Sequence, residues 1–333
     1  MKKVRHIIAF LLALLLFLSV SWGLAWVLMP NRVDYGCMWG AYRKEERNSI
    51  DVLFFGSSMV YCDIVPSCIW EESGLRCYDV TGPEQTMPIT YCYVREALRT
   101  QSPKLVMLDV SEMFFRKYEH YTKANIGYMP LGMNRLRATV TAAEKQELGG
   151  LLFPLYNYHT RWESVELDEI RMRLNPEPDL FAGYTFLSDA AAYAEEYDRT
   201  SSAETETYQD NLKWLAKIQN YCEKKGVELK LFLAPAIGKI PAAALNTLRA
   251  DASAMGLTLI DFNDNLSELE IDNYNDWFDT LHFNYRGAEK FSHWLGTYLP
   301  TLTDAPERTA EEDAYWQVRA DYFNNRCAEE PQV

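Results

Sequence analysis

The sequence predicts an α/β protein, a three-layer α/β/α sandwich around a parallel sheet of about five strands. Two observations support this fold class. Five short and almost continuous apolar runs, rich in β-branched and aromatic residues, recur along the chain, and longer segments with helical periodicity separate several of them. Such runs are typical of parallel strands that helices cover on both faces. A length of 333 residues and a hydrophobic content of 48% suffice for a sizeable core.

Residues 1–32 are expected to form a cytoplasmic N-terminus and a transmembrane anchor. Lys2, Lys3 and Arg5 precede an uncharged stretch from Ile7 to Met29, and ~20 apolar residues are enough to cross a bilayer as a helix. A cleaved signal peptide is the alternative, but its apolar region is shorter, ~7–15 residues, and no clean Ala-x-Ala site follows. The basic N-terminal side favours the cytoplasm, so the rest of the chain is expected to be extracytoplasmic.

Beyond a polar connector, residues 33–50, expected strands and helices alternate within one domain, residues 51–303. The expected strands are IDVLFFG (50–56), LRCYDV (75–80), PKLVMLDV (103–110), VELKLFLAP (227–235) and LTLIDF (257–262). Helical periodicity is clearest in PITYCYVREALR (88–99), DNLKWLAKIQNYCEKKG (210–226) and AEKFSHWLGTYL (288–299).

Two segments depart from this alternation. Residues 115–207, rich in Tyr, Met, Arg and Glu, lack a good strand and are expected to form a helical insertion between the third and fourth strands. Insertions at strand ends in open α/β sheets often shape the ligand site. Residues 304–333 are expected to form an acidic, peripheral C-terminal tail.

Composition excludes some partners and cofactors. The net charge of −14 argues against nucleic acid or anionic lipid, because phosphate binding requires a basic face. Seven scattered cysteines with no Cys-x-x-Cys pair argue against a zinc cluster. The serine chemistry considered below requires neither a metal nor a cofactor, and none is expected. Free buried thiols are expected, and a bridge between Cys68 and Cys77 stays open.

The run LFFGSSMVY ends a strand in Gly56 and two hydroxyl residues, Ser57 and Ser58. Either this is an ordinary Gly/Ser loop or a serine is held at the strand end to react. A serine nucleophile needs a base, and the base usually needs an acid that orients it. His282 follows Asp279 by three residues in DTLHF, before the last predicted helix. Because the carboxyl ends of parallel strands share one edge, these groups can meet there.

Together, LFFGSSMVY and DTLHFNYRGAEKF resemble the first and last motif blocks of the SGNH (GDSL-like) hydrolase superfamily, over residues 51–303. The resemblance implies a flavodoxin-like fold with Ser58 as nucleophile, His282 as base and Asp279 as its orienting acid. Ser57 stands where many members have aspartate. The segment YDVTGPEQTMP is similar to the second block, so Gly82 and Ser58 would supply backbone N–H groups to an oxyanion.

The third block of that superfamily, Gly-x-Asn-Asp, has no counterpart in LDVSEMFF. Gln85 and Ser111 are candidates to replace its asparagine as an oxyanion donor; the alternative is an enzyme that uses an activated acyl donor. His159, in NYHTRW, is a further candidate for a substrate cleft, with a structural role as the alternative. The altered blocks and the anchor resemble the cell-envelope branch, which includes the D-alanyl transfer protein of teichoic acids and polysaccharide O-acetyltransferases.

This resemblance implies a membrane-anchored extracytoplasmic acyltransferase or esterase. It would act through an acyl-serine on O-acyl groups, acetyl above all, of cell-envelope glycans or polymers. A membrane-bound O-acyltransferase is the partner that it implies. The missing asparagine and the Ser57 replacement leave open an alternative, a non-catalytic envelope assembly or binding protein with the same fold.

Overall fold

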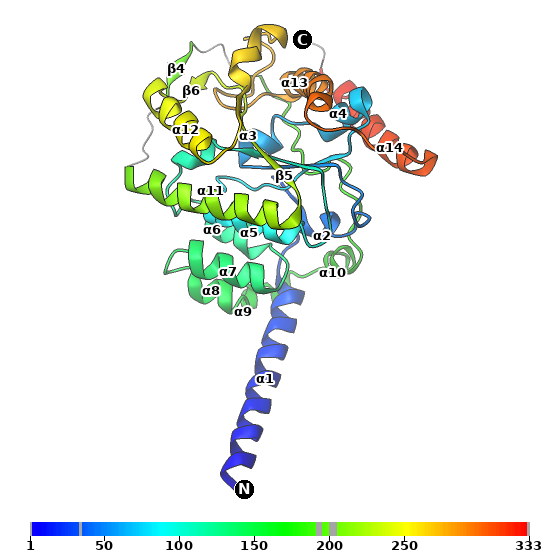
Figure 1. The fold of residues 1–333 in the computed structure, drawn as a ribbon. Helices are drawn as coiled ribbons and strands as arrows, with labels where there is room; N and C mark the ends of the chain where they lie inside the picture. Colours follow the sequence, from blue (N-terminus) through cyan, green and yellow to red (C-terminus); the bar gives the residue numbers. More distant parts are fainter. Residues whose placement is uncertain (1, 33–34, 191–194, 200–204, 332–333) are drawn as a thin grey trace.

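The computed structural model describes residues 2–32, 35–190, 195–199 and 205–331, and a five-stranded sheet lies at its centre (Figure 1). All neighbouring strands are parallel, in the order β2-β1-β3-β5-β7. The strands are β1 (Val52–Phe55), β2 (Cys77–Asp79), β3 (Leu105–Asp109), β5 (Glu228–Leu233) and β7 (Leu259–Asp261). Each lies within one of the five apolar runs, so the predicted fold class is confirmed.

Helices cover both faces of the sheet. Along β1, Leu53 and Phe55 point into one core, whereas Val52 and Phe54 point into the other, and all four are fully buried. The first core is closed by α5 (Met87–Ala97), α11 (Thr205–Lys225) and α12 (Ala242–Ala254), and the second by α4 (Pro66–Ser73) and α13 (Tyr285–Tyr298). Burial on both faces explains why the strands are hydrophobic throughout rather than alternating with polar residues.

Between β3 and β5, where the sequence predicts a helical insertion, the chain forms a series of short helices. They are η1 (Ser111–Phe114), α6 (Thr122–Gly127), α7 (Met133–Ala142), α8 (Leu148–Leu152), α9 (Leu155–Tyr158), η2 (His159–Glu163) and α10 (Leu167–Leu174). The segment also contains β4 (Tyr197–Asp198), which pairs in parallel with β6 (Gly238–Lys239) and was not expected. A strand of two residues is too short to leave a periodic pattern.

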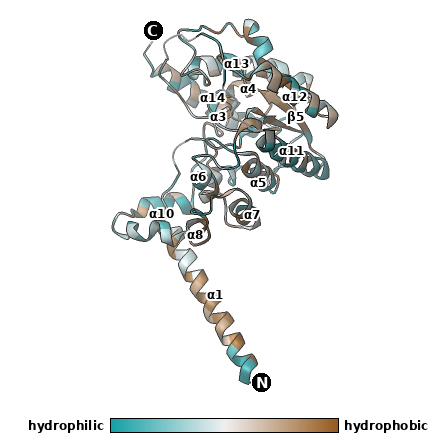
Figure 2. Ribbon diagram, turned by 90° about the vertical axis from the view of Figure 1, so that its left-hand side faces the viewer, coloured by the Kyte–Doolittle hydropathy of each residue, from teal (hydrophilic) through white to brown (hydrophobic). Residues whose placement is uncertain are grey.

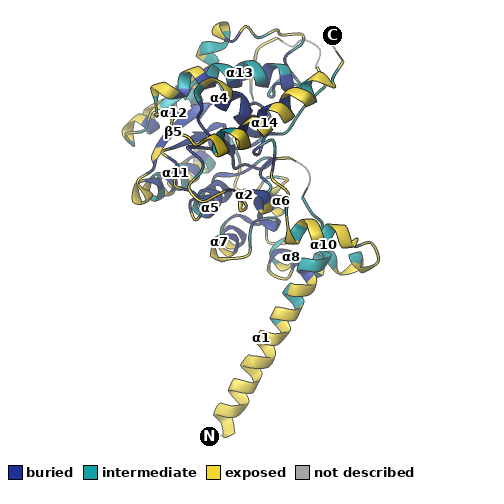
Figure 3. Ribbon diagram, turned by 90° about the vertical axis from the view of Figure 1, so that its right-hand side faces the viewer, coloured by how far each residue is buried: buried dark blue, intermediate teal, exposed yellow. Residues whose placement is uncertain are grey.

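The N-terminal helix α1 (Lys2–Leu28) projects away from the domain as one continuous element (Figure 1). It is hydrophobic along most of its length (Figure 2), and almost all of its surface is exposed (Figure 3). Among the described residues it is the one helix long and apolar enough to cross a bilayer. A membrane anchor and a signal sequence share this form.

The C-terminal segment 304–333 is not the peripheral tail that was expected. It contains α14 (Ala310–Ala328), which packs against α4 and buries Trp316, Ala320 and Phe323. These three side chains recur at helical spacing, so one apolar face is present on a helix that is otherwise charged. The high charge of the segment obscured that face in the sequence.

The connector, residues 33–50, also contributes to the core. It contains the short helix α2 (Trp39–Tyr42), in which Trp39 and Tyr42 are buried. Glu45 accepts a hydrogen bond of 2.6 Å from Arg319 of α14, and both side chains of this ion pair are buried. This buried ion pair therefore joins the connector before β1 to the C-terminal helix α14.

Candidate active site

Ser58 lies at the carboxyl edge of the sheet, just after β1 ends. Gly56 has a φ of 155°, which favours glycine, and a Cβ there would lie 2.6 Å from Cγ2 of Val60. The next residue, Ser57, is buried, whereas Ser58 is half-buried and begins α3 (Ser58–Tyr61). The strand ends in glycine because the chain must pass close to Val60 before it presents the Ser58 hydroxyl.

The imidazole of His282 joins Ser58 to a carboxylate. Its Nε2 lies 2.8 Å from Oγ of Ser58, and its Nδ1 lies 2.9 Å from Oδ2 of Asp279. If Nδ1 donates to the carboxylate, Nε2 is left as an acceptor for the hydroxyl proton of Ser58. The structure thus brings together the three side chains that the sequence singles out, and the hydroxyl in contact is that of Ser58 rather than Ser57.

A tight turn fixes the Asp279 carboxylate. Its Oδ1 accepts hydrogen bonds from the N–H groups of Leu281, at 2.7 Å, and His282, at 2.9 Å. The turn is tied to the loop after α3, because the Phe283 N–H donates to Oδ1 of the buried Asp63 at 2.8 Å. A hydrogen bond from the backbone of one loop to a side chain of the other therefore fixes the base relative to the nucleophile.

The charge on Asp279 matches this arrangement. Partial burial alone would raise the pKa of the Asp279 carboxyl, but hydrogen bonds from the His282 side chain and from the turn outweigh it and lower the pKa. Asp279 therefore stays ionised and can hold one imidazole tautomer. By contrast, burial raises the pKa of Asp63 well above its usual range.

Gly82 follows β2, the strand next to β1, at the same edge of the sheet. A side chain there would collide with Oδ1 of Asn125, which comes from α6. Asn125 is fully buried, and its Nδ2 donates to the carbonyl oxygen of Pro83 at 2.8 Å. Sequence reasoning missed Asn125, because it lies in the insertion and belongs to no recognisable motif.

The two residues considered as replacements for the missing asparagine are engaged elsewhere. Nε2 of the buried Gln85 donates to the hydroxyl of Thr90 at 3.0 Å, and that hydroxyl in turn donates to Glu112 at 2.9 Å. The Ser111 hydroxyl donates to the carboxylate of Asp109, the last residue of β3. Neither side chain contacts Ser58 or His282 through a hydrogen bond in the described structure.

A small cavity of about 50 Å³ lies between Met59, Ser111 and the residues that follow β5 and β7. Arg199 also lines it, with its Nε donating to the carbonyl oxygen of Gly238 at 2.7 Å. Burial lowers the pKa of the Arg199 guanidinium, and the nearby carboxylate of Asp109 opposes that shift. No sequence motif marks Arg199, which follows β4 and is brought to this cavity by the pairing of β4 with β6.

His159 is not brought to the triad. It begins η2, is exposed, and its Nδ1 lies 2.9 Å from the carbonyl oxygen of Tyr156. This part of the insertion packs beside α1, on the opposite side of the domain from α13 (Figure 1). Its position gives no support to the predicted role in a substrate cleft.

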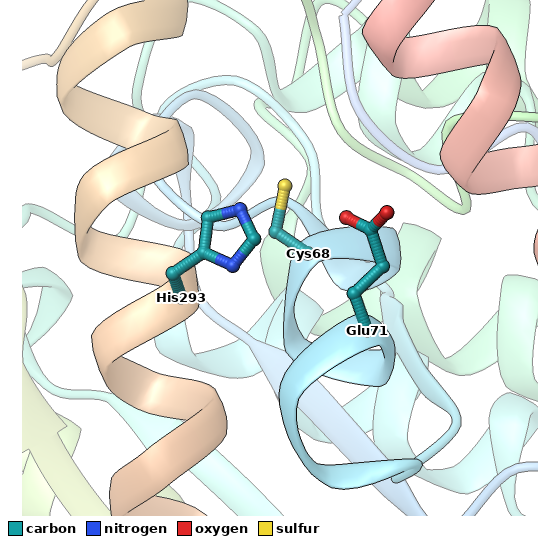
Figure 4. Close-up of side chains that lie close together, drawn as sticks. All are labelled: Cys68, Glu71 and His293. Atoms are coloured by element: carbon teal, nitrogen blue, oxygen red, sulfur yellow. The ribbon is translucent and has the colours of Figure 1, made fainter.

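All seven cysteines are free, so Cys68 and Cys77 form no bridge. Within the described residues, one group of three side chains could together hold a metal ion: Cys68, Glu71 and His293, between α4 and α13 (Figure 4). Nδ1 of His293 already lies 2.9 Å from Oε1 of Glu72. Burial and nearby carboxylates raise the pKa of the Cys68 thiol, which disfavours the thiolate that binds metals. The triad uses none of these groups.

Comparison with known proteins gives distant matches only. No family model and no curated protein matches the sequence. A crystal structure from Bacteroides fragilis, designated an acylhydrolase, is 11% identical with a TM-score of 0.40, over 79% of this chain and 94% of that one. A gut microbial diltiazem-metabolizing enzyme is 11% identical with a TM-score of 0.28, over 78% and 49%. Likenesses this distant concern the fold alone, so function is inferred from the site.

Proposed function

We propose that the protein is a serine acyltransferase or esterase that forms an acyl enzyme on Ser58. The observation that carries this proposal is the continuous hydrogen-bonded chain from Ser58 Oγ to His282, at 2.8 Å, and on to Asp279, at 2.9 Å. A serine hydroxyl is a weak nucleophile until a base takes its proton. Here the base is in contact with the hydroxyl, and a carboxylate orients the base.

In the proposed reaction, Oγ of Ser58 attacks the carbonyl carbon of an ester while Nε2 of His282 takes the hydroxyl proton. The tetrahedral intermediate then breaks its bond to the leaving oxygen, which receives that proton from the imidazolium and departs as an alcohol. A second hydroxyl, from a glycan or from water, then attacks the acyl-serine while His282 takes its proton. This second intermediate breaks its bond to Oγ of Ser58, which recovers the proton from His282, and the new ester or the free acid leaves. A glycan acceptor makes the reaction a transfer, and water makes it a hydrolysis.

The backbone N–H groups of Ser58 and Gly82 are the proposed oxyanion donors. Both lie at the carboxyl edge of neighbouring strands, and neither donates a hydrogen bond to another group in the described structure. Such donors are worth ~10²–10³ in rate each. Because the segment LDVSEMFF lacks the asparagine of the Gly-x-Asn-Asp block, which would add a third donor, we expect slow hydrolysis of simple esters.

The proposed substrates are short O-acyl groups, acetyl above all, on cell-envelope glycans or polymers. The apolar helix α1 supports a membrane-anchored, extracytoplasmic domain of the kind seen in the cell-envelope branch of the SGNH superfamily, which this chain resembles. In that setting a membrane-bound O-acyltransferase is the proposed partner.

A second candidate is an envelope assembly or binding protein that keeps the fold without turnover. It is favoured by the hydrogen bonds of Gln85 with Thr90 and of Ser111 with Asp109, because neither of these two side chains is then free to replace the missing asparagine.

Ester hydrolysis by the full chain in detergent distinguishes the two candidates. With p-nitrophenyl acetate as substrate, Ser58→Ala should remove turnover, while Ser57→Ala, the matched control one residue away, should retain most of it. A fluorophosphonate probe should label the wild-type protein and the Ser57→Ala variant but not Ser58→Ala. Absence of both turnover and labelling in the wild type would favour the binding protein.

A further inference from the structure

The insertion carries an unusual apolar surface near the end of α1. We use the name collar for residues 131–174, which contain α7, α8, α9, η2 and α10. Many large apolar side chains are exposed there, among them five that are between 50% and 71% exposed: Met133, Val140, Phe153, Trp162 and Leu167. Elsewhere in the described domain, outside α1, the exposed large apolar side chains are all tyrosines except Val318. Exposed apolar side chains are therefore concentrated in the collar. Such a concentration is uncommon on the surface of a soluble protein and is typical of an interaction site.

The collar is fixed to the end of α1 by two arginines. Arg161 donates to the carbonyl oxygen of Leu28 at 2.8 Å, and Arg173 donates to the carbonyl oxygens of Trp26 and Met29. The last carbonyls of a helix have no partner within it, and a cation there also interacts favourably with the helix dipole. Because both arginines belong to the collar, its position along the axis of α1 is set.

That position coincides with the expected membrane surface. A hydrocarbon core of ~30 Å takes ~20 helical residues, so a span that begins at Ile7 ends near Trp26. Tryptophan is enriched at this level of membrane helices. The guanidinium of Arg135, in α7, lies 5.5 Å from the ring of Trp22, and that of Arg173, in α10, lies 5.3 Å from the ring of Trp26. Both sides of the collar thus contact α1 where a bilayer ends.

A cavity of about 540 Å³ separates part of the collar from α1. Trp22 and Trp26 of α1 line it, together with Leu131 and Met172 of the collar. The two arginines that lie over these tryptophan rings, Arg135 and Arg173, also line it. Its volume is within the range of small-molecule sites, ~300–1,000 Å³, and such sites are mostly apolar.

We infer that the collar is embedded in the outer leaflet of the membrane, and that the cavity between it and α1 takes one acyl chain of a phospholipid. The inference rests on the proposed role of α1 as an anchor and goes beyond it, because it adds a second, non-spanning contact that sets the orientation of the domain. The contact inferred here is apolar, through the exposed side chains of the collar and the apolar residues of the cavity, so phosphatidylcholine is a sufficient lipid with which to test it.

Photo-crosslinking of the full chain tests this inference. The protein is reconstituted in phosphatidylcholine vesicles that contain a phosphatidylcholine with a diazirine in its acyl chain, and adducts are mapped by mass spectrometry. Adducts are expected on α1 and on collar peptides that contain Phe153 or Leu167. Adducts confined to α1 would overturn the inference and leave the anchor standing, whereas an unlabelled α1 would overturn both.

Matched substitutions separate membrane contact from folding. Phe153→Asp and Leu167→Asp should each reduce the adducts on their own peptide at least several-fold, with far-UV circular dichroism and esterase activity in detergent unchanged. Val318→Asp, on the exposed face of α14, is the control and should change none of the collar adducts. Equal effects of the control and collar substitutions would contradict a specific membrane contact.

Discussion

Oγ of Ser58 and Nε2 of His282 lie 2.8 Å apart, although 224 positions separate the two residues in the sequence. Ser58 is positioned by the sharp glycine turn after β1, and His282 by the turn before α13. The hydrogen bond from the Phe283 N–H to Asp63 joins these two loops directly. The contact is thus a consequence of two local turns that meet at one edge of a parallel sheet.

The first prediction concerns the carboxylate that orients His282. Asp279→Asn can keep the backbone hydrogen bonds of the turn through its amide oxygen, but an amide that donates to Nδ1 favours the wrong imidazole tautomer. We expect the rate of ester hydrolysis to fall by ~10³–10⁴, as in other serine triads, with little change in Tm. Asn284, not Asp279, caps α13 through its side chain, so no helix cap is lost.

A matched control for this change is Asp272→Asn. Asp272 also fixes a turn by accepting a backbone N–H, that of Tyr274 at 2.8 Å, but it is not bonded to His282. Its replacement should leave turnover within a factor of two or so. Comparable losses in the two variants would mean that turn geometry, not imidazole orientation, is what Asp279 supplies.

The second prediction tests the packing of Asn125 over Gly82. Gly82→Ala should abolish activity and lower the free energy of unfolding, by about 1–3 kcal/mol, because the added methyl group collides with the Asn125 amide. Asn125→Ala alone should lower activity less; it removes the hydrogen bond to the carbonyl oxygen of Pro83 but adds no collision. In the double variant the collision is gone, so stability should recover toward that of Asn125→Ala.

This double-mutant cycle has a clear contrary outcome. If the stability losses of the two single substitutions simply add in the double variant, Asn125 and Gly82 do not interact. Thermal unfolding and p-nitrophenyl acetate hydrolysis, measured on all four proteins, provide the two readouts.

The third prediction concerns pH. Burial raises the pKa of Asp109 to about 6, against the opposing effect of its hydrogen bonds with Ser111. The folded state therefore binds this proton more tightly than the unfolded state, and the associated stability is present below the unfolded pKa of ~3.9 and lost as pH rises through about 6. Asp109→Asn removes this dependence, since an amide is neutral throughout.

The free energy of unfolding of Asp109→Asn, relative to wild type, should thus increase by roughly 2–3 kcal/mol between pH 4 and pH 7. Denaturant titrations at both pH values measure the difference. Buried acids that do not interact with Asp109 cancel because both proteins share them, whereas Asp63 and Glu112, whose pKa values the charge of Asp109 raises, contribute to it. A difference that stays constant with pH would show that Asp109 is ionised in the folded protein across this range.

Much of the fold, and the triad, could be predicted from the sequence because their signals are local. Continuous apolar runs predict the five strands. The glycine and two serines at the end of a strand, together with Asp279 three residues before His282, predict the residues of the candidate active site. Asn125 and Arg199 could not be predicted in the same way. Each reaches the site through the packing of the insertion, which depends on contacts far along the chain.

The C-terminal helix illustrates a related limit. Trp316 and Phe323 stand among acidic residues, and that composition predicts a peripheral segment. Both side chains are nevertheless buried. Contacts such as the ion pair between Arg319 and Glu45 fix the position of this helix. They join segments far apart in the chain, so the local sequence around neither residue predicts them.

The most direct test of the central claim is to trap the acyl enzyme. The full chain in detergent is mixed with p-nitrophenyl acetate, quenched with acid within the first turnovers, digested and sequenced by mass spectrometry. We predict one acetyl group on Ser58 in the wild type, a higher occupancy in Asp279→Asn if deacylation is slowed more than acylation, and none in Ser58→Ala. Turnover by the wild type without an acetyl group on Ser58, or with one on Ser57 instead, would contradict the assignment of Ser58 as the nucleophile.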